Sequence, residues 1–231
     1  ADFGNDHRLG GDEAPPSIIS VYLGEQLQDV MNQLVSTGMA THSIKGEHLD
    51  TGVQTLPDFL KDATDRNRTS PFAFTGNKFE FRMLGSSNSI ACANTMLNSA
   101  VAESLKIYAD RLEKAADFET ALHEMIQKTI KDHKRIIFNG NGYDDEWIRE
   151  ATEERGLLNY RTTPDALPHL LDQKNADLLM THKIYTEAEI RSRFEITLEN
   201  YCKTVMIEAY TMASMARTEI LPAIEHVTSQ M

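Results

Sequence analysis

Two cations and a carboxylate alternate with apolar side chains at the end of the stretch RTSPFAFTGNKFEFRM, residues 68–83. The charged residues are Lys78, Glu80 and Arg82. In a strand they would share one face, about 6.6 Å apart, because successive side chains alternate faces and each residue rises roughly 3.3 Å. Such a row could bind an ion or a phosphate, or it could be only the solvated face of a half-buried strand. The pattern alone favours the solvated face.

Further groups suited to the chemistry of anions lie in the same part of the sequence. Arg8, Arg66 and Arg68 are cations that can bind carboxylate or phosphate through paired hydrogen bonds. Glu13 and Glu80 are carboxylates that could hold a hard divalent ion or accept a proton. These residues indicate either metal-assisted chemistry on anions or a surface ion-pair network.

The elements that must position these groups differ between the two parts of the chain. Residues 1 to about 90 are rich in glycine, proline and short apolar runs, whereas residues 88–231 are almost wholly helical in pattern. The run SIISVYLG predicts a short buried strand, and the helix that follows should end at Gly38. Residues 39–66 read mostly as loop. Two helices, over 88–114 and 118–137, should form a hairpin.

The last helix is expected to be long and to begin at a capping box made by Thr186 and Glu189. Apolar residues continue along it in steps of three and four, and Pro222 should kink or end it. The pattern does not show whether this stripe packs within the chain or against a neighbouring subunit. Earlier, GNGY at 140–143 predicts a turn, and Trp147 is the expected buried residue of an otherwise solvated helix.

Composition limits the classes of partner. The chain has 231 residues, with 23 basic against 35 acidic side chains and a net charge of −12, which disfavours nucleic acid and anionic membranes. It has no apolar run long enough to span a bilayer and no signal peptide at its start, so we expect a cytoplasmic location. Cys92 and Cys202 are expected to be reduced and packed in the core.

Three segments together resemble glutamine synthetase, most closely the large type III form found in bacteria. They are NDHRLGGDEAPPSII, DRNRTSPFAFTGNKFEFRMLGSS and FNGNGYDDEW, and they occur in the family's order. The resemblance implies an α+β, mostly α fold, with short antiparallel strands followed by a long-helix C-terminal region. Residues 1–90 would be the C-terminal part of the catalytic domain, with the flap loop and the active-site strand. Residues 91–231 would be a helical region with a possible assembly role.

The resemblance also implies roles for the charged residues. Glu80 would bind a divalent metal, Mg or Mn, and Arg82 would bind the reacting substrates. Arg8 would hold the glutamate substrate, and Arg68 would stabilise the phosphate transferred from ATP. Glu13 would lie on a flap that closes over the site and would take a proton from ammonium. Phe79 and Phe81 would pack on the core and fix the strand.

Three features depart from the family's pattern. The spacing between Arg8 and Glu13 is one residue shorter than in the shorter bacterial enzymes. Ala73 stands where those enzymes have a second arginine, for which Arg66 could compensate. Lys78 stands where many members have a nucleotide-contacting arginine, so it would contact ATP with a point charge instead of a bidentate fork.

The other metal ligands and much of the ATP pocket of the family have no counterpart in this sequence. We therefore expect the chain to be the C-terminal portion of a longer enzyme, a homo-oligomeric ring acting on glutamate, ammonia and ATP, and to be inactive alone. The alternative is a helical oligomerisation module without catalysis of its own.

Overall fold

The computed structural model describes residues 6, 14–43, 48–49, 59–60, 69–85 and 88–230. Contacts within the chain divide it into two compact units, Phe3–Thr162 and Thr163–Met231. The helices between residues 91 and 162 therefore belong to the same compact unit as the strands before residue 90. The functional division at residues 1–90 and 91–231 stays a prediction.

A small three-stranded sheet lies in the first unit. Its order is β1 (Val21–Tyr22), β4 (Phe72–Phe74) and β5 (Phe79–Phe81). The predicted antiparallel pairing holds for β4 and β5, but β1 pairs with β4 in parallel, so the sheet is mixed. A separate antiparallel pair joins β2 (His48–Leu49) and β3 (Phe59–Leu60). The predicted strand in SIISVYLG is confirmed only over its two residues in β1.

The hairpin between β4 and β5 is closed by local hydrogen bonds. The Thr75 amide donates to the Lys78 carbonyl at 2.8 Å, and the Arg82 amide donates to the Pro71 carbonyl at 2.7 Å. Gly76, in the turn, has φ of 92°, a left-handed conformation that residues with a Cβ adopt at a cost. The turn therefore fixes the register that places Glu80 opposite Ala73.

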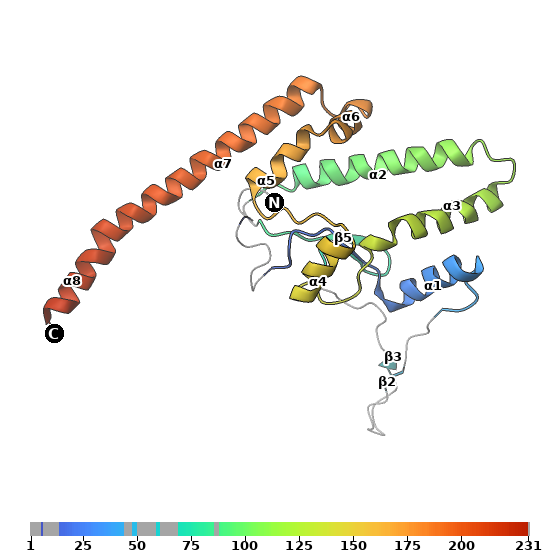
Figure 1. Ribbon diagram of the computed structural model, residues 1–231, viewed down its shortest axis with the longest axis horizontal. Helices are drawn as coiled ribbons and strands as arrows, with labels where there is room; N and C mark the ends of the chain where they lie inside the picture. Colours follow the sequence, from blue (N-terminus) through green and yellow to red (C-terminus); the bar gives the residue numbers. More distant parts are fainter. Residues whose placement is uncertain are drawn as a thin grey trace. The chain divides into compact units, whose positions relative to one another are not determined.

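The first unit also contains three long helices. They are α1 (Gly24–Thr37), α2 (Ala91–Leu112) and α3 (Phe118–His133), the last continuing as a 3-10 turn, η1 (Lys134–Ile136). The predicted end of α1 is confirmed, since Gly38 has φ of 82° and its amide caps Leu34. The predicted α2–α3 hairpin is also confirmed, and α1 lies along α3 (Figure 1), where the Gln127 amide donates to the Leu34 carbonyl at 3.0 Å.

The core of this unit forms around the single tryptophan. Trp147 lies in α4 (Asp145–Arg149), which continues as a π-helical segment, η2 (Glu150–Glu154). Trp147 packs with Ile18 and Ala151, and the Phe138 ring stacks on it with centroids 3.6 Å apart. Its predicted burial is confirmed. A bridge between Val21 and Ile137 links this core to the sheet.

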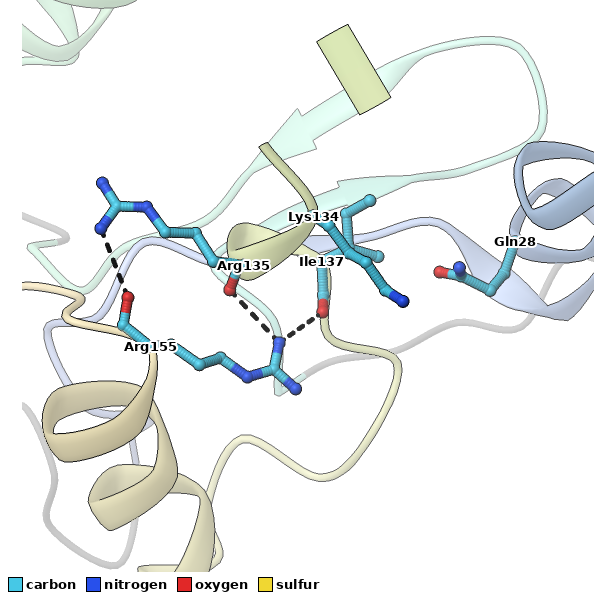
Figure 2. A pocket seen from close by; sticks show the side chains of 5 residues that line it. All are labelled: Gln28, Lys134, Arg135, Ile137 and Arg155. Carbon is cyan, nitrogen blue, oxygen red and sulfur yellow. Dashed lines mark hydrogen bonds between the residues drawn. The ribbon is translucent and has the colours of Figure 1, made fainter. Parts of the chain in front are cut away.

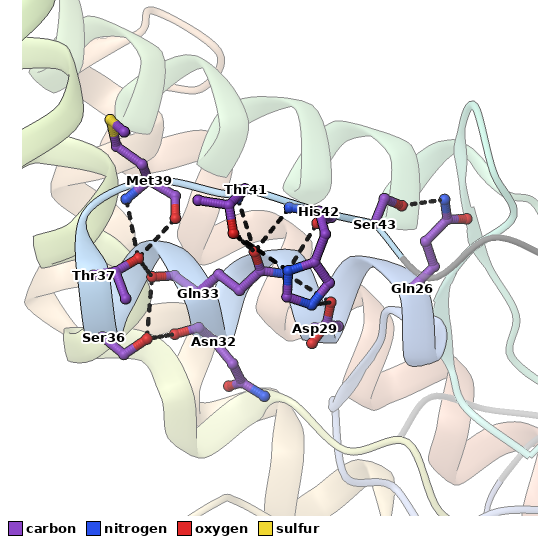
Figure 3. Close-up of polar contacts among 10 residues, drawn as sticks. All are labelled: Gln26, Asp29, Asn32, Gln33, Ser36, Thr37, Met39, Thr41, His42 and Ser43. Carbon is purple, nitrogen blue, oxygen red and sulfur yellow. Dashed lines mark hydrogen bonds and ion pairs between the residues drawn. The ribbon is translucent and has the colours of Figure 1, made fainter.

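Polar side chains fasten the segment after α1 back onto the helix (Figure 3). The side-chain oxygen of Gln33, Oε1, accepts from the backbone amides of Thr41 and His42 at 2.9 and 3.3 Å. Asp29, one turn before Gln33 on α1, has its carboxylate 3.6 Å from the His42 ring nitrogen Nε2. Gln26, about two turns before Gln33, donates from its side-chain amide to the Ser43 hydroxyl at 2.7 Å. Residues 41–43 therefore run antiparallel to α1 without forming a regular element.

The second unit consists of helices. They are α5 (Thr163–Ala166), η3 (Leu167–Leu171), α6 (Gln173–Thr181), α7 (Glu187–Met215), η4 (Ala216–Ile220) and α8 (Leu221–Gln230). The predicted capping box is confirmed: the Thr186 amide donates to Glu189 at 2.8 Å, and the Glu189 amide donates to the Thr186 hydroxyl at 3.3 Å. Pro222 does not end the helix. The π-helical turn η4 precedes it and accommodates the missing amide and the proline ring.

The long helices bury few side chains in this chain. Ser99 is the buried residue of α2, and Ile190 is that of α7. The expectation that Cys92 and Cys202 pack in the core is wrong, because both lie on exposed sides of these helices. Among the described residues, none of the helices combines the length and the apolar character that crossing a bilayer requires.

Candidate functional site

The charged row on β5 and its flanks forms as the alternation predicts. The Glu80 carboxylate lies between the two cations, 2.5 Å from Arg82 Nη2 and 3.4 Å from Lys78 Nζ. The side chains of Glu80 and Arg82 are 37% and 33% exposed, and that of Lys78 is 65% exposed. The row is therefore a continuous ion-pair network on one face of the strand, open to solvent.

The cations keep the carboxylate ionised. The hydrogen bond from Arg82 lowers the pKa of Glu80 below its ordinary value, and the Lys78 ammonium lowers this pKa further. An ionised carboxylate is an acceptor and a hard oxygen ligand, not a proton donor. Glu80 is therefore suited to contact a cation and unsuited to act as a general acid near neutral pH.

The residues beside Glu80 in the sheet are buried. Ala73 lies directly opposite Glu80, and Tyr22 lies next to Ala73 across β1. Both are almost fully buried, at 1% and 3% exposure. The position where the shorter bacterial enzymes have a second arginine is thus a packed position in this chain. A guanidinium placed there would lose its hydration, which the alanine avoids.

Phenylalanine rings occupy the other face of the hairpin. Phe72 stacks on Phe79 with centroids 5.2 Å apart, and Phe81 and Phe74 complete the group. The expectation that Phe79 packs on the core is wrong, because it is 48% exposed. β5 is an edge strand of this sheet, so it has a neighbouring strand on one side only. The rings stiffen the hairpin through contacts with one another.

Four candidate residues lie outside the described part of the chain. They are Arg8, Glu13, Arg66 and Arg68. The structure thus brings together Lys78, Glu80 and Arg82 and leaves the predicted roles of the other four as predictions. Within the described ranges, no group of three or more His, Cys, Asp or Glu side chains could hold a metal ion. Glu80 fits a divalent ion as one oxygen ligand, and any further ligands must come from elsewhere.

A contact that sequence reasoning did not find anchors the chain just before β4. The Gly142 amide donates to the Thr69 hydroxyl at 2.8 Å, across 73 positions of sequence. A Cβ on Gly142 would lie 2.4 Å from the Thr69 carbonyl oxygen, so only glycine fits this approach. The predicted turn at 140–143 is confirmed. The NGNG sequence predicts the turn, but it does not indicate that the turn contacts Thr69.

Comparison with known proteins agrees with the three segments discussed above. A family model described as glutamine synthetase C-terminal domain matches residues 121–231. A type-3 glutamine synthetase from Dictyostelium discoideum is 43% identical to this chain over 223 residues. The chain belongs to the glutamine synthetase family. Glutamine synthetases from Butyrivibrio fibrisolvens and Bacteroides fragilis are 43% and 40% identical over 228 and 225 residues.

The matches cover most of this chain but a minority of each relative. Each of the three covers 95% of this chain, and the chain spans 30% of the first relative and 31% of the other two. The described strand with Glu80 lies before the region matched by the C-terminal domain model. The charged row and the helical region are therefore both parts of a glutamine synthetase sequence, while most of such an enzyme lies outside this chain.

Proposed function

We propose that this chain is the C-terminal portion of a type-3 glutamate–ammonia ligase that forms glutamine with ATP. The γ-phosphate of ATP passes to the side-chain carboxylate of glutamate and releases ADP. Ammonia then attacks the acyl carbon of γ-glutamyl phosphate, and phosphate leaves. The observation that carries the proposal is the ionised Glu80 carboxylate, fixed on a strand between Lys78 and Arg82, in a chain of this family.

The three residues of the charged row on β5 and its flanks have distinct proposed roles in this reaction. Glu80 is the oxygen ligand of Mg or Mn, and its lowered pKa keeps it in the ionised form that a ligand requires. Arg82 holds an anionic group of the reacting substrates, and Lys78 contacts the nucleotide. When bound, the divalent ion neutralises charge on the phosphates. In this chain Arg82 and Lys78 hold the carboxylate of Glu80 in place.

The remaining roles rest on the family's motifs. Arg8 binds the glutamate substrate, and Arg68 stabilises the transferred phosphoryl group. Glu13 lies on a flap that excludes water from the acyl phosphate and takes a proton from ammonium. Thr69, whose hydroxyl accepts a hydrogen bond from the Gly142 amide, follows Arg68 directly in sequence. A homo-oligomeric ring and a cytoplasmic location also remain predictions for the full-length enzyme.

The test is glutamate- and ammonia-dependent ADP release by the full-length parent enzyme carrying Glu80→Gln. We expect turnover to fall by at least about 100-fold at unchanged assembly, because the amide keeps the shape but loses the charge that binds the cation. Glu153→Gln, on the exposed side of η2, is the matched control and should keep normal turnover. Normal turnover of Glu80→Gln would mean that Glu80 is only a solvated strand residue.

The isolated chain gives a second test of the same proposal. We expect it to release no glutamate-dependent ADP, because its described residues supply one metal ligand and most of the relatives' length is absent. A glutamate-dependent signal from the purified chain would contradict this expectation. The full-length enzyme, assayed at the same concentration, is the positive control.

A second candidate function is assembly through the helical region. The second half of α7 exposes large apolar side chains, with Val205 at 43%, Ile207 at 63% and Met212 at 69% exposure. A helix that is apolar on several sides is usually covered in the mature assembly. Light scattering at several concentrations tests this function: growth of the mean mass with concentration supports assembly by this region, and a constant monomer mass contradicts it.

A further inference from the structure

A pocket away from the charged row lies where three segments of the first unit meet (Figure 2). It is an open cavity of about 330 Å³ lined by Gln28, Lys134, Arg135, Ile137 and Arg155. Gln28 comes from α1, the next three from η1 and the residue after it, and Arg155 from the end of η2. None of the lining residues carries a carboxylate. In a chain with a net charge of −12, such a lining is a local concentration of positive charge.

Most donors of Arg155 are used in holding the fold. Its Nη1 donates to the carbonyls of Arg135 at 3.2 Å and Ile137 at 2.8 Å, as Figure 2 shows. Its Nε and Nη2 contact Glu150 at 2.7 and 2.5 Å. A guanidinium has five N–H groups, so one on Nη2 is left. The carbonyls at the end of η1, which would repel an anion, are already paired with this guanidinium.

Lys134 is the cation of this pocket that the fold does not use. Within the described part of the chain, the structure records no hydrogen bond or ion pair for its ammonium. It extends toward Gln28 in Figure 2. The side-chain amide of Asn139 donates to the Gln28 side-chain oxygen at 3.4 Å, and the Gln28 amide nitrogen donates to Asn32 Oδ1 at 3.2 Å. An amide nitrogen has two N–H groups, so one N–H of Gln28 is left as a donor. Arg135 contributes less, since its Nη1 reaches the carbonyls of Arg155 and Gly156.

We propose that this pocket binds a phosphate group, held by the Lys134 ammonium, the Gln28 amide and the remaining Nη2 donor of Arg155. Donors that arrive from three separate segments suit the tetrahedral oxygens of phosphate better than the planar oxygens of a carboxylate. Lys134, Arg135 and Arg155 line the pocket and Glu150 pairs with Arg155, so these four side chains carry a net charge of about +2, which favours an anion. The cavity leaves room beside the phosphate for a small attached group, and Ile137 gives that side an apolar wall. The proposal does not rest on the proposed ligase activity.

Isothermal titration calorimetry of the 231-residue chain with inorganic phosphate tests the proposal, with ionic strength held constant by sodium chloride. We expect saturable binding that Lys134→Gln weakens by roughly tenfold or more, the effect of losing one charge-assisted hydrogen bond. Lys131→Gln is the matched control: it removes the same charge one turn earlier, from α3, outside the pocket lining. It should change the affinity by less than about twofold.

Two further measurements complete the test. Gln28→Glu keeps the side chain's shape but adds a negative charge, so it should abolish phosphate binding even if Lys134→Gln proves poorly folded. Glycerol 3-phosphate, titrated in parallel, distinguishes a site for a phosphomonoester, which it would bind more tightly, from a site for free phosphate. Absence of saturable phosphate binding by the wild-type chain, or equal binding by Lys134→Gln and Lys131→Gln, would overturn the proposal.

Discussion

Replacing Gly142 by alanine should destabilise the first unit, because the new methyl group meets backbone and not a flexible side chain. The Cβ would lie 2.4 Å from the Thr69 carbonyl oxygen and 3.2 Å from its carbonyl carbon. Contacts of a Cβ below 3.0 Å essentially do not occur, so the two segments must separate by at least the 0.6 Å between 2.4 and 3.0 Å. That movement also stretches the 2.8 Å hydrogen bond from Gly142 to the Thr69 hydroxyl.

The expected loss combines these two effects. Overpacking in a closely fitted place costs about 1–3 kcal/mol, and loss of one hydrogen bond adds about 1 kcal/mol. Urea unfolding of the chain followed by circular dichroism should therefore show the free energy of unfolding lowered by roughly 2–4 kcal/mol, with an unchanged slope. Thr69→Ser, which keeps the hydroxyl that accepts from Gly142, is the control and should lose less than about 1 kcal/mol.

A double-mutant cycle separates this contact from other effects of the substitution. Thr69→Val removes the acceptor of the same hydrogen bond. The double mutant should therefore lose less free energy of unfolding than the sum of the losses of the two single mutants. In the full-length enzyme, Gly142→Ala should also lower turnover, since the displaced residue adjoins Arg68 in sequence. A Gly142→Ala chain with the wild-type unfolding midpoint would refute the close packing of these two segments.

Three more predictions concern the core and the start of the long helix. Trp147→Ala should lower the free energy of unfolding by about 3–5 kcal/mol in urea titrations, because it removes the ring that stacks on Phe138, whereas Trp147→Phe should lose less; equal losses would contradict a role for ring size. Thr186→Ala should lower the free energy of unfolding by about 1 kcal/mol in calorimetry, and Thr186→Ser should lower it little, since the serine keeps the capping hydroxyl. Equal stability of the wild type and both variants would show that the cap is not needed. The hydrogen bond from the Thr186 amide lowers the pKa of Glu189, so its stabilising effect is present above the pKa of the unfolded chain and is lost as pH falls through the folded pKa. Melting temperatures measured from about pH 6 to pH 3 should therefore fall less steeply for Glu189→Gln, and identical pH profiles would contradict this assignment.

Features that depend on residues close together in the sequence could be predicted from it. The end of α1 at Gly38 needs only the conformational freedom of one glycine, and the capping box needs only Thr186 and Glu189, three positions apart. The charged face of β5 follows from strict alternation over Lys78 to Arg82, and the pairing distances bear this out. The family resemblance, confirmed by the comparisons, likewise rests on short segments with a fixed order.

Burial and long-range contact could not be predicted in this way. Cys92 and Cys202 lie within apolar helical patterns, yet both are exposed, because periodicity shows that a stripe exists and not what covers it. Phe79 shares the apolar face of β5 but lies half exposed, because only the order of the sheet places β5 at an edge. The parallel pairing of β1 with β4 joins segments about fifty residues apart, and no local pattern specifies it.

The sequence by itself thus determined the local elements, the charged row and the family. Only the tertiary structure decided that the turn at Gly142 holds Thr69, and that Arg155 joins the end of η2 to the carbonyls after α3. The physical reason is the range of the interactions. Helix ends, turns and alternation are set by backbone conformation within a few residues, whereas a close approach across 73 positions exists only once the packed chain brings both segments together.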